Sequence, residues 1–194
     1  MWLYKMSPVR RTVLICIAFQ VLLWSMFLVS FLNHRSNWEN VVPGVPGAAA
    51  EGGFLGTLLF ILSRNLLICL LIAVGNLFVR FGWFTPGLAV LVVQAVSIGW
   101  MAGSNGFEVP FTTVTAANLQ YLRIGLWETT AYAVVCAITL PKSLLVATSF
   151  PASKWDEVRK LKDIRFDNTE KIIVLAGFAV LFAAAAIEAW FLAA

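Results

Sequence analysis

The chain has 194 residues, of which 60% are apolar and only 12% are charged, and its mean hydropathy is +0.85. Soluble domains are roughly 45–50% apolar and about 25% charged, so this composition excludes a soluble domain and indicates a single membrane domain. The formal charge of +4 does not indicate nucleic-acid binding. Half of the 14 Lys and Arg residues lie between Lys142 and Lys171, without the interleaved aromatic residues on which bases stack.

The first apolar run, Thr12 to Leu32, is long enough to cross a bilayer, which takes about 20 helical residues. Lys5, Arg10 and Arg11 precede it, so a signal peptide is one interpretation. The run is longer than a usual signal sequence, however, and no small-residue cleavage motif follows it. We therefore expect an uncleaved first transmembrane helix.

The second run, from Phe54 to Val79, is interrupted by the pair Arg64–Asn65. Either one tilted helix spans the bilayer, which we favour, or Phe54–Ser63 lies in the membrane interface and a shorter helix begins at Arg64. The third run follows the turn-like sequence GWFTPG. Pro86 suits the first turn of a helix, so this helix is expected to begin near Thr85.

The fourth run begins at Tyr121, after a polar segment whose Pro110 and threonines suggest extended backbone, and Pro141 bends or ends it. A fifth run extends from Ile172 to the end of the sequence, with Asp167 or Asn168 as its expected N-cap. The sequence therefore predicts an all-α, polytopic membrane helix bundle. Its transmembrane helices are expected at residues 12–32, 54–79, 82–102, 121–140 and 172–192, with a loop at 141–171.

This loop is expected to contain a short amphipathic helix over residues 153–166. Ser153 and Asp156 match the S-x-x-[DE] capping pattern. Apolar residues then recur every three positions: Trp155, Val158, Leu161 and Ile164. Such a helix rests on the membrane surface or docks a cytosolic protein, and we favour the membrane surface.

The distribution of Lys and Arg predicts the orientation of the chain, because loops rich in these residues stay in the cytoplasm. Basic residues are dense before the first helix and between the fourth and fifth, whereas Asn33–Gly53 contains only Arg35 and Gly103–Gln120 contains none. We therefore expect a prokaryotic inner-membrane protein with a cytoplasmic N-terminus and an external C-terminus.

Several polar residues fall inside the apolar runs, at depths in the outer half of the membrane. They are Arg64, Asn65, Arg123, Glu128 and Glu188. Charged residues inside a membrane are costly, by about 2.5–3.5 kcal/mol on insertion scales, and they persist where they pair, line a cavity or bind a partner. One interpretation is an ion-pair network, with Arg64 pairing Glu128. Another is a polar cavity for a substrate or for a polar segment of a partner. A proton relay is the third, although the sequence shows no continuous chain of carboxylates or histidines for it.

The residues offer little support for catalysis or for a cofactor. The cysteines Cys16, Cys69 and Cys136 lie apart in apolar runs, and His34, the only histidine, lies in a polar segment. This pattern favours buried thiols over a metal site and excludes haem ligation by a membrane-embedded histidine. No GxxxxGK[ST] motif is present either, so we expect no cofactor, no P-loop and no enzyme activity.

Short motifs between Leu59 and Leu140 resemble the stage II sporulation protein M-like family of multi-pass membrane proteins. They are Asn65 with Gly75, the segment Gln94 to Gly99, and the G-x-x-E sequence from Gly125 to Glu128. Ile124 stands where that family usually has His, so no role that needs this histidine is implied. The resemblance implies an integral component of a larger machine, as in peptidoglycan-cutting, peptide-export and immunity systems, some of which have an ATPase partner.

Together these observations predict a non-catalytic membrane subunit that scaffolds or anchors a larger complex. The alternative is a permease-like subunit of a transporter that a separate ATPase drives, and a membrane-embedded enzyme is the third interpretation. The expected partners are the lipid bilayer and other membrane subunits, with a cytosolic protein possible at residues 153–166 and nucleic acid excluded.

Overall fold

The computed structural model describes residues 2–39, 41, 53–147 and 154–193. Within these residues, five helical segments are long and apolar enough to cross a membrane. They are α2 (Pro8–Asn33), α4 (Gly53–Phe78), α5 (Pro86–Gly103), the segment Val114–Lys142 and α8 (Asn168–Ala193). The predicted all-α, polytopic architecture is therefore confirmed.

The segment Val114–Lys142 combines several helix types in one continuous run. It consists of α6 (Val114–Gln120), the π-helical turn η1 (Tyr121–Gly125), α7 (Leu126–Thr139) and the 3-10 turn η2 (Leu140–Lys142). The expected start at Tyr121 is wrong, because the threonine-rich stretch caps a helix instead of forming extended backbone. The Thr113 hydroxyl accepts a hydrogen bond of 3.1 Å from the amide of Ala116, which is an N-cap interaction.

The other four long helices begin and end within four residues of the expected positions. α4 is one continuous helix through Arg64–Asn65, which excludes a break at Arg64. Thr85 caps α5 by accepting a hydrogen bond of 3.1 Å from the amide of Leu88. At the start of α8, Asp167 Oδ1 accepts from the Glu170 amide, and Glu170 Oε2 accepts from the Asp167 amide. This reciprocal capping confirms the expectation of Asp167 as a cap.

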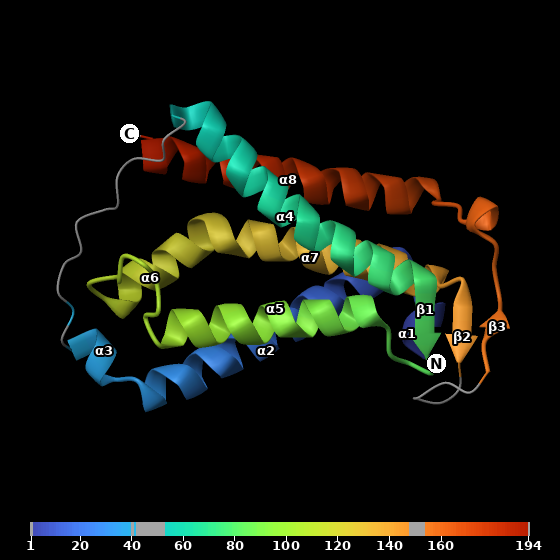
Figure 1. The fold of residues 1–194 in the computed structure, drawn as a ribbon, viewed down its shortest axis with the longest axis horizontal. Coiled ribbons are helices and arrows are strands. Elements are labelled where there is room, and N and C mark those ends of the chain that lie inside the picture. The colour runs from blue at the N-terminus through green and yellow to red at the C-terminus, as the bar shows by residue number, and fades with distance from the viewer. Residues whose placement is uncertain (1, 40, 42–52, 148–153, 194) are drawn as a thin grey trace.

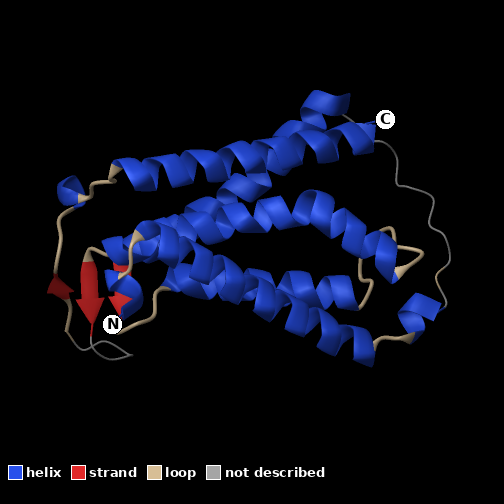
Figure 2. Cartoon of the chain, turned by 180° about the vertical axis from the view of Figure 1, so that it is seen from behind, coloured by secondary structure: helices blue, strands red, loops and turns tan. Residues whose placement is uncertain are grey.

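Successive long helices run in opposite directions, so the bundle has two ends (Figure 1). We call one the sheet end, because it carries the strands β1 (Val79–Phe81), β2 (Leu145–Ala147) and β3 (Asp156–Glu157). We call the other the α6 end. The short helices α1 (Trp2–Lys5) and α3 (Ser36–Glu39) lie at the sheet end and the α6 end respectively. The view from behind shows the same arrangement, with all strands gathered at one end (Figure 2).

Helix α7 lies at the centre of the bundle and packs against α2, α4 and α8. Its residues from Ala131 to Ile138 are all buried, and small residues such as Ala133 and Ala137 let its neighbours approach closely. On one side, α2 packs along α5, and on the other α4 crosses α8 obliquely (Figure 1). A helix surrounded in this way is expected to be apolar on all faces, and the α7 residues from Ala131 to Ile138 fit this expectation.

The predicted amphipathic helix over residues 153–166 is wrong for its described part, 154–166. Asp156–Glu157 instead forms strand β3, which pairs antiparallel with β2, and the turn η3 (Leu161–Asp163) is 3-10 helical. β2 also pairs in parallel with β1, at the end of α4. The free edge of β2 offers backbone hydrogen-bonding groups to the segment, and an extended conformation uses them. Ser153, the expected cap, lies outside the described residues.

The four apolar residues of that predicted helix consequently share no face. Trp155 packs edge-on against Phe81, with ring centroids 5.3 Å apart. The Val158 amide donates a hydrogen bond of 2.9 Å to the Leu144 carbonyl, which extends the β2 pairing. Leu161 is 69% exposed, and Ile164 follows η3 in extended conformation. The apolar stripe therefore does not form.

Candidate functional site

The polar side chains inside the bundle gather at three levels: around Asn65 toward the α6 end, around Asn76 nearer the sheet end, and around Glu170 at the sheet end itself. Each level joins different helices. The first level includes most of the residues predicted from the sequence.

Asn65 and Glu128 join α4 to α7. The Asn65 side-chain amide donates a hydrogen bond of 2.5 Å to Glu128 Oε1, and the Tyr132 hydroxyl donates to Asn65 Oδ1. Asn65 is buried, and Glu128 is partly buried beside it. A buried amide with both its donor and its acceptor engaged holds the carboxylate in one place, so Glu128 is positioned by the fold.

A second set of polar residues surrounds the π-helical turn η1. The Tyr121 hydroxyl donates to Gln20 Oε1 over 2.8 Å, which ties η1 to α2. Thr129 donates over 2.8 Å to the carbonyl of Gly125, the last residue of the turn. A Cβ at Gly125 would lie 2.7 Å from the Tyr121 ring, so glycine lets this ring fold back onto the helix. Such π-helical turns occur frequently at functional sites.

Beside η1 lies a cavity of about 170 Å³, which we call the η1 cavity. Glu128 and Glu188 both line it, from α7 and α8. Five aromatic side chains also line it: Trp24, Phe27, Phe107, Phe111 and Tyr121. Its other lining residues are Leu23, Ile98, Ala102, Ala117, Asn118, Gln120, Ile124 and Gly125. The cavity is therefore mostly apolar, with two carboxylates.

The expected ion pair between Arg64 and Glu128 is wrong. Among the described residues no salt bridge joins them, and Glu128 is hydrogen-bonded to Asn65 instead. Successive helical residues point about 100° apart, so when Asn65 faces α7, Arg64 faces outward. The Arg64 guanidinium lies 5.6 Å from the centroid of the Phe60 ring, and the residue is exposed.

The sequence-predicted cluster is thus brought together only in part. Asn65 binds Glu128, and Glu188 shares the η1 cavity with Glu128. Arg123 lies outside this group, with its guanidinium 3.7 Å from the centroid of the Phe191 ring. Arginine over an aromatic face is stabilised by the ring quadrupole, so Arg123 has a role that needs no carboxylate.

The second polar level joins α4, α5 and α7 through Asn76, which is 0% exposed. Its side-chain nitrogen donates to Thr139 Oγ1 over 2.9 Å and to the Cys136 carbonyl over 3.2 Å. Its side-chain oxygen accepts from Thr85 Oγ1 over 2.5 Å. This network is complete, and it leaves no side-chain group of Asn76 for a ligand.

The third level is an ion-pair cluster at the sheet end that the sequence analysis missed. Glu170 of α8 pairs with Lys142 over 2.8 Å and with Arg11 over 3.7 Å. Arg11 also donates over 2.5 Å to the Ala137 carbonyl, and all three charged side chains are buried. The D-x-x-E pattern at Asp167–Glu170 signalled the cap, but nothing in the sequence linked it to Arg11, 159 residues earlier. The cluster fastens the ends of α2, α7 and α8 together.

Tyr4 lies at the same end, in α1. Its hydroxyl donates a hydrogen bond of 2.9 Å to the Trp83 carbonyl, and the Arg80 guanidinium lies 4.6 Å from the centroid of its ring. Burial raises the pKa of the Tyr4 hydroxyl to about 12, although the positive charge of Arg80 opposes this shift. The neutral hydroxyl therefore links α1 to the turn before α5 over the physiological pH range.

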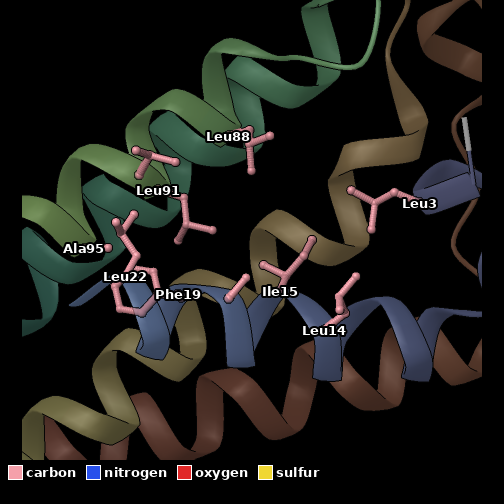
Figure 3. Close-up of a pocket in the computed structure, with 10 residues that line it drawn as sticks. Leu3, Leu14, Ile15, Phe19, Leu22, Leu88, Leu91 and Ala95 are labelled. Carbon is pink, nitrogen blue, oxygen red and sulfur yellow. The ribbon is translucent and has the colours of Figure 1, made fainter. Parts of the chain in front are cut away.

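A second cavity, of about 200 Å³, lies between α2 and α5 and is lined only by apolar residues. Figure 3 shows Leu14, Ile15 and Phe19 of α2 opposite Leu88 and Leu91 of α5, with Leu3 closing one side. This lining provides neither a proton donor nor a proton acceptor, so the cavity is suited only to an apolar occupant.

No described part of the chain contains a group of three or more His, Cys, Asp and Glu side chains that could hold a metal ion. Comparison with protein-family models, with characterised proteins and with solved structures gave no significant match. The resemblance to the stage II sporulation protein M-like family therefore stays an expectation from short motifs.

Proposed function

We propose that this chain is a non-catalytic integral membrane subunit that scaffolds or anchors a larger membrane protein complex. The observation that carries the proposal is the position of Arg64. It lies roughly 16 Å from the start of α4, a helix about 39 Å long, and therefore at membrane depth. It is exposed on the side of the helix, and no carboxylate in the described chain forms a salt bridge with it.

The surroundings of Arg64 favour a protein partner. Arg64 follows Phe60 and precedes Leu67 and Leu71 on one face of α4, and these three apolar residues are 60%, 55% and 50% exposed. An arginine that faces lipid at this depth is costly, whereas one that meets a carboxylate on a neighbouring helix is stabilised. The face thus suits a transmembrane helix of another subunit that carries Asp or Glu at the same depth.

The orientation that we propose has the sheet end in the cytoplasm of a prokaryotic cell. All Lys and Arg residues except Arg35, Arg64 and Arg123 belong to segments at that end. The N-terminus is then cytoplasmic and the C-terminus external. With this orientation the η1 cavity lies toward the external side.

The permease-like alternative has weaker support. A transported substrate needs a path between the two ends of the bundle. Between the η1 cavity and the sheet end, α4 and α7 pack around fully buried residues, among them Ile72 and Cys136. The cavity between α2 and α5 is lined only by apolar residues, so it offers no polar path. The enzyme alternative lacks a matched acid and base beside a nucleophile. Among the described residues that line the η1 cavity, only Glu128 and Glu188 are of the types Asp, Glu, His, Lys and Arg.

Affinity purification from native membranes in mild detergent tests the proposal. We expect the wild-type chain to retain a membrane partner and the Arg64→Leu variant to lose it, because the substitution removes the charge that the partner neutralises. Arg64→Lys keeps the charge and should retain at least part of the complex. Arg35→Leu, an exposed arginine at the α6 end, is the matched control and should retain the partner. Unchanged partners in Arg64→Leu, with normal membrane insertion, would contradict the proposal.

A further inference from the structure

The η1 cavity combines features that the proposed scaffold function does not use. It is large enough for a small molecule, it is walled by aromatic side chains, and two carboxylates line it. No Lys or Arg is among its described lining residues. We infer that the η1 cavity is a binding site for a compact organic ammonium ion.

The described residues that line the cavity place no Lys or Arg beside the two carboxyl groups. One oxygen of Glu128 accepts the hydrogen bond from Asn65, and Glu188 makes no hydrogen bond or salt bridge with any described residue. Arg64 is close enough to attract Glu188 electrostatically, but it carries one charge for two carboxylates and lies over Phe60. A cation bound in the cavity would pair with these carboxylates, since buried charges in proteins are usually paired.

The walls of the cavity select the kind of cation. Aromatic faces attract ammonium groups, and cages of aromatic side chains recognise quaternary ammonium ligands. Trp24 and Tyr121 lie edge-to-face, with centroids 5.3 Å apart, as do Phe107 and Phe111 at 5.0 Å. An inorganic ion such as Ca²⁺ needs about six to eight oxygen ligands, which this mostly apolar lining does not supply.

The volume of the cavity limits the size of the ligand. Cavities for drug-sized molecules have volumes of roughly 300–1,000 Å³, whereas an apolar cavity of about 150 Å³ holds a molecule the size of benzene. At about 170 Å³, the η1 cavity suits a group the size of choline. The ammonium is either a free small molecule or the headgroup of a lipid.

Calorimetric titration of the full chain in a non-ionic detergent tests the inference, with choline as the probe and its uncharged analogue 3,3-dimethyl-1-butanol as the control ligand. We expect saturable binding of choline and about tenfold weaker binding of the uncharged analogue, because the charge contributes to the affinity. Equal affinity for the two ligands would overturn the inference, since an apolar cavity alone would explain it. Absence of saturable choline binding would also overturn it.

Variants locate the site. Glu188→Gln keeps the size of the side chain and breaks no described hydrogen bond, so the fold should persist while choline binds about tenfold more weakly. Phe107→Leu keeps an apolar side chain in the wall but removes an aromatic ring. It should therefore weaken the binding of choline more than the binding of the uncharged analogue. Glu39→Gln replaces an exposed carboxylate at the same end, outside the cavity, and should leave binding unchanged. Undiminished choline binding in both Glu188→Gln and Phe107→Leu would place the ammonium elsewhere and overturn the inference.

Bilayer nanodiscs distinguish the two sources of the ammonium group. The Kd for choline is compared between nanodiscs of phosphatidylglycerol alone and nanodiscs that also contain phosphatidylethanolamine. If a lipid headgroup fills the cavity, the apparent Kd should be higher in the second kind, because the lipid competes with choline. If a free amine is the ligand, the Kd should be the same in both. Choline binding in phosphatidylglycerol nanodiscs is expected in either case, and its absence would contradict the site itself. The inference does not rest on the scaffold function, because it holds whether or not Arg64 contacts a partner.

Discussion

Asn76 shows how a single polar side chain fixes the relation of three membrane helices. It projects from α4, bonds Cys136 and Thr139 of α7, and accepts from Thr85, the residue that caps α5. Interhelical hydrogen bonds inside a membrane contribute about 0.6 kcal/mol each on average, and up to about 2 kcal/mol. Because Asn76 makes several of them at one place, it specifies the geometry as well as the stability of the bundle.

Replacing Asn76 with leucine is therefore expected to lower the free energy of unfolding by about 1–3 kcal/mol, since Thr85 and the α7 groups lose their buried partner. The measurement is reversible unfolding in mixed detergent micelles, followed by circular dichroism. Asn33→Leu is the matched control, because Asn33 is exposed and bonds only within α2. Equal stability of the Asn76 and Asn33 variants would show that the Asn76 network contributes little.

At the scale of elements, the crossing of α4 and α5 depends on glycine at the contact. A Cβ on Gly87 would clash with the Ile72 carbonyl and with the Asn76 side chain, and a Cβ on Gly75 would clash with the backbone of Gly87. The two helix backbones thus touch directly where the Asn76 network begins. Close backbone approach of this kind is a common source of stability between membrane helices, for which lipid already provides an apolar environment.

Gly87→Ala is accordingly expected to destabilise the bundle by about 1–3 kcal/mol, because the added methyl group pushes backbone against backbone. Gly56→Ala is the control on α4: a Cβ there meets nothing within 4 Å, so the change should be neutral or stabilising by up to about 1 kcal/mol. The same unfolding measurement compares the two variants. An unchanged free energy of unfolding in Gly87→Ala would mean that the two helices can move apart at little energetic cost.

The elements that the sequence predicted well are those defined by long apolar runs and by local capping. The five long helices, the start of α5 near Thr85 and the cap at Asp167 need no information from distant residues. The start of the fourth helix was missed although its cap at Thr113 is local, but two other errors arose where distant residues decide. Asp156–Glu157 forms a strand because it pairs with β2. Arg64 does not pair with Glu128, because the next residue of α4, Asn65, is the one that faces α7.

In the candidate site, too, the features that depend on local sequence were predictable and those that depend on distant residues were not. That Asn65, Glu128 and Glu188 lie in helices long enough to span a membrane was predictable from the apolar runs. The depth of Glu128 was not, because its helical segment begins at Val114 and not at Tyr121. The contacts of these three residues were not predictable, because the rotation of each helix about its own axis depends on packing. The ion-pair cluster of Arg11, Lys142 and Glu170 was missed for a related reason: each of these residues lies at a helix end, where a charge usually reaches solvent.

At the scale of the whole molecule, the two ends differ in both charge and structure. The sheet end combines the small sheet, the buried ion pairs and most basic residues, whereas the α6 end carries the η1 cavity and a single loop arginine, Arg35. This asymmetry matches the rule that Lys and Arg near membrane helices stay in the cytoplasm. The charge pattern therefore favours the orientation that we propose, with the sheet end in the cytoplasm.

Cysteine labelling of intact cells tests this orientation. In a background without Cys16, Cys69 and Cys136, single cysteines replace Glu39 at the α6 end and Lys162 at the sheet end, both exposed positions. A membrane-impermeant maleimide should modify the cysteine at position 39 and reach the one at position 162 only after the cells are permeabilised. The reverse pattern would invert the proposed orientation and move the η1 cavity to the cytoplasmic side. Labelling of both positions in intact cells would contradict the five-span arrangement, because an odd number of crossings separates the two ends of the bundle.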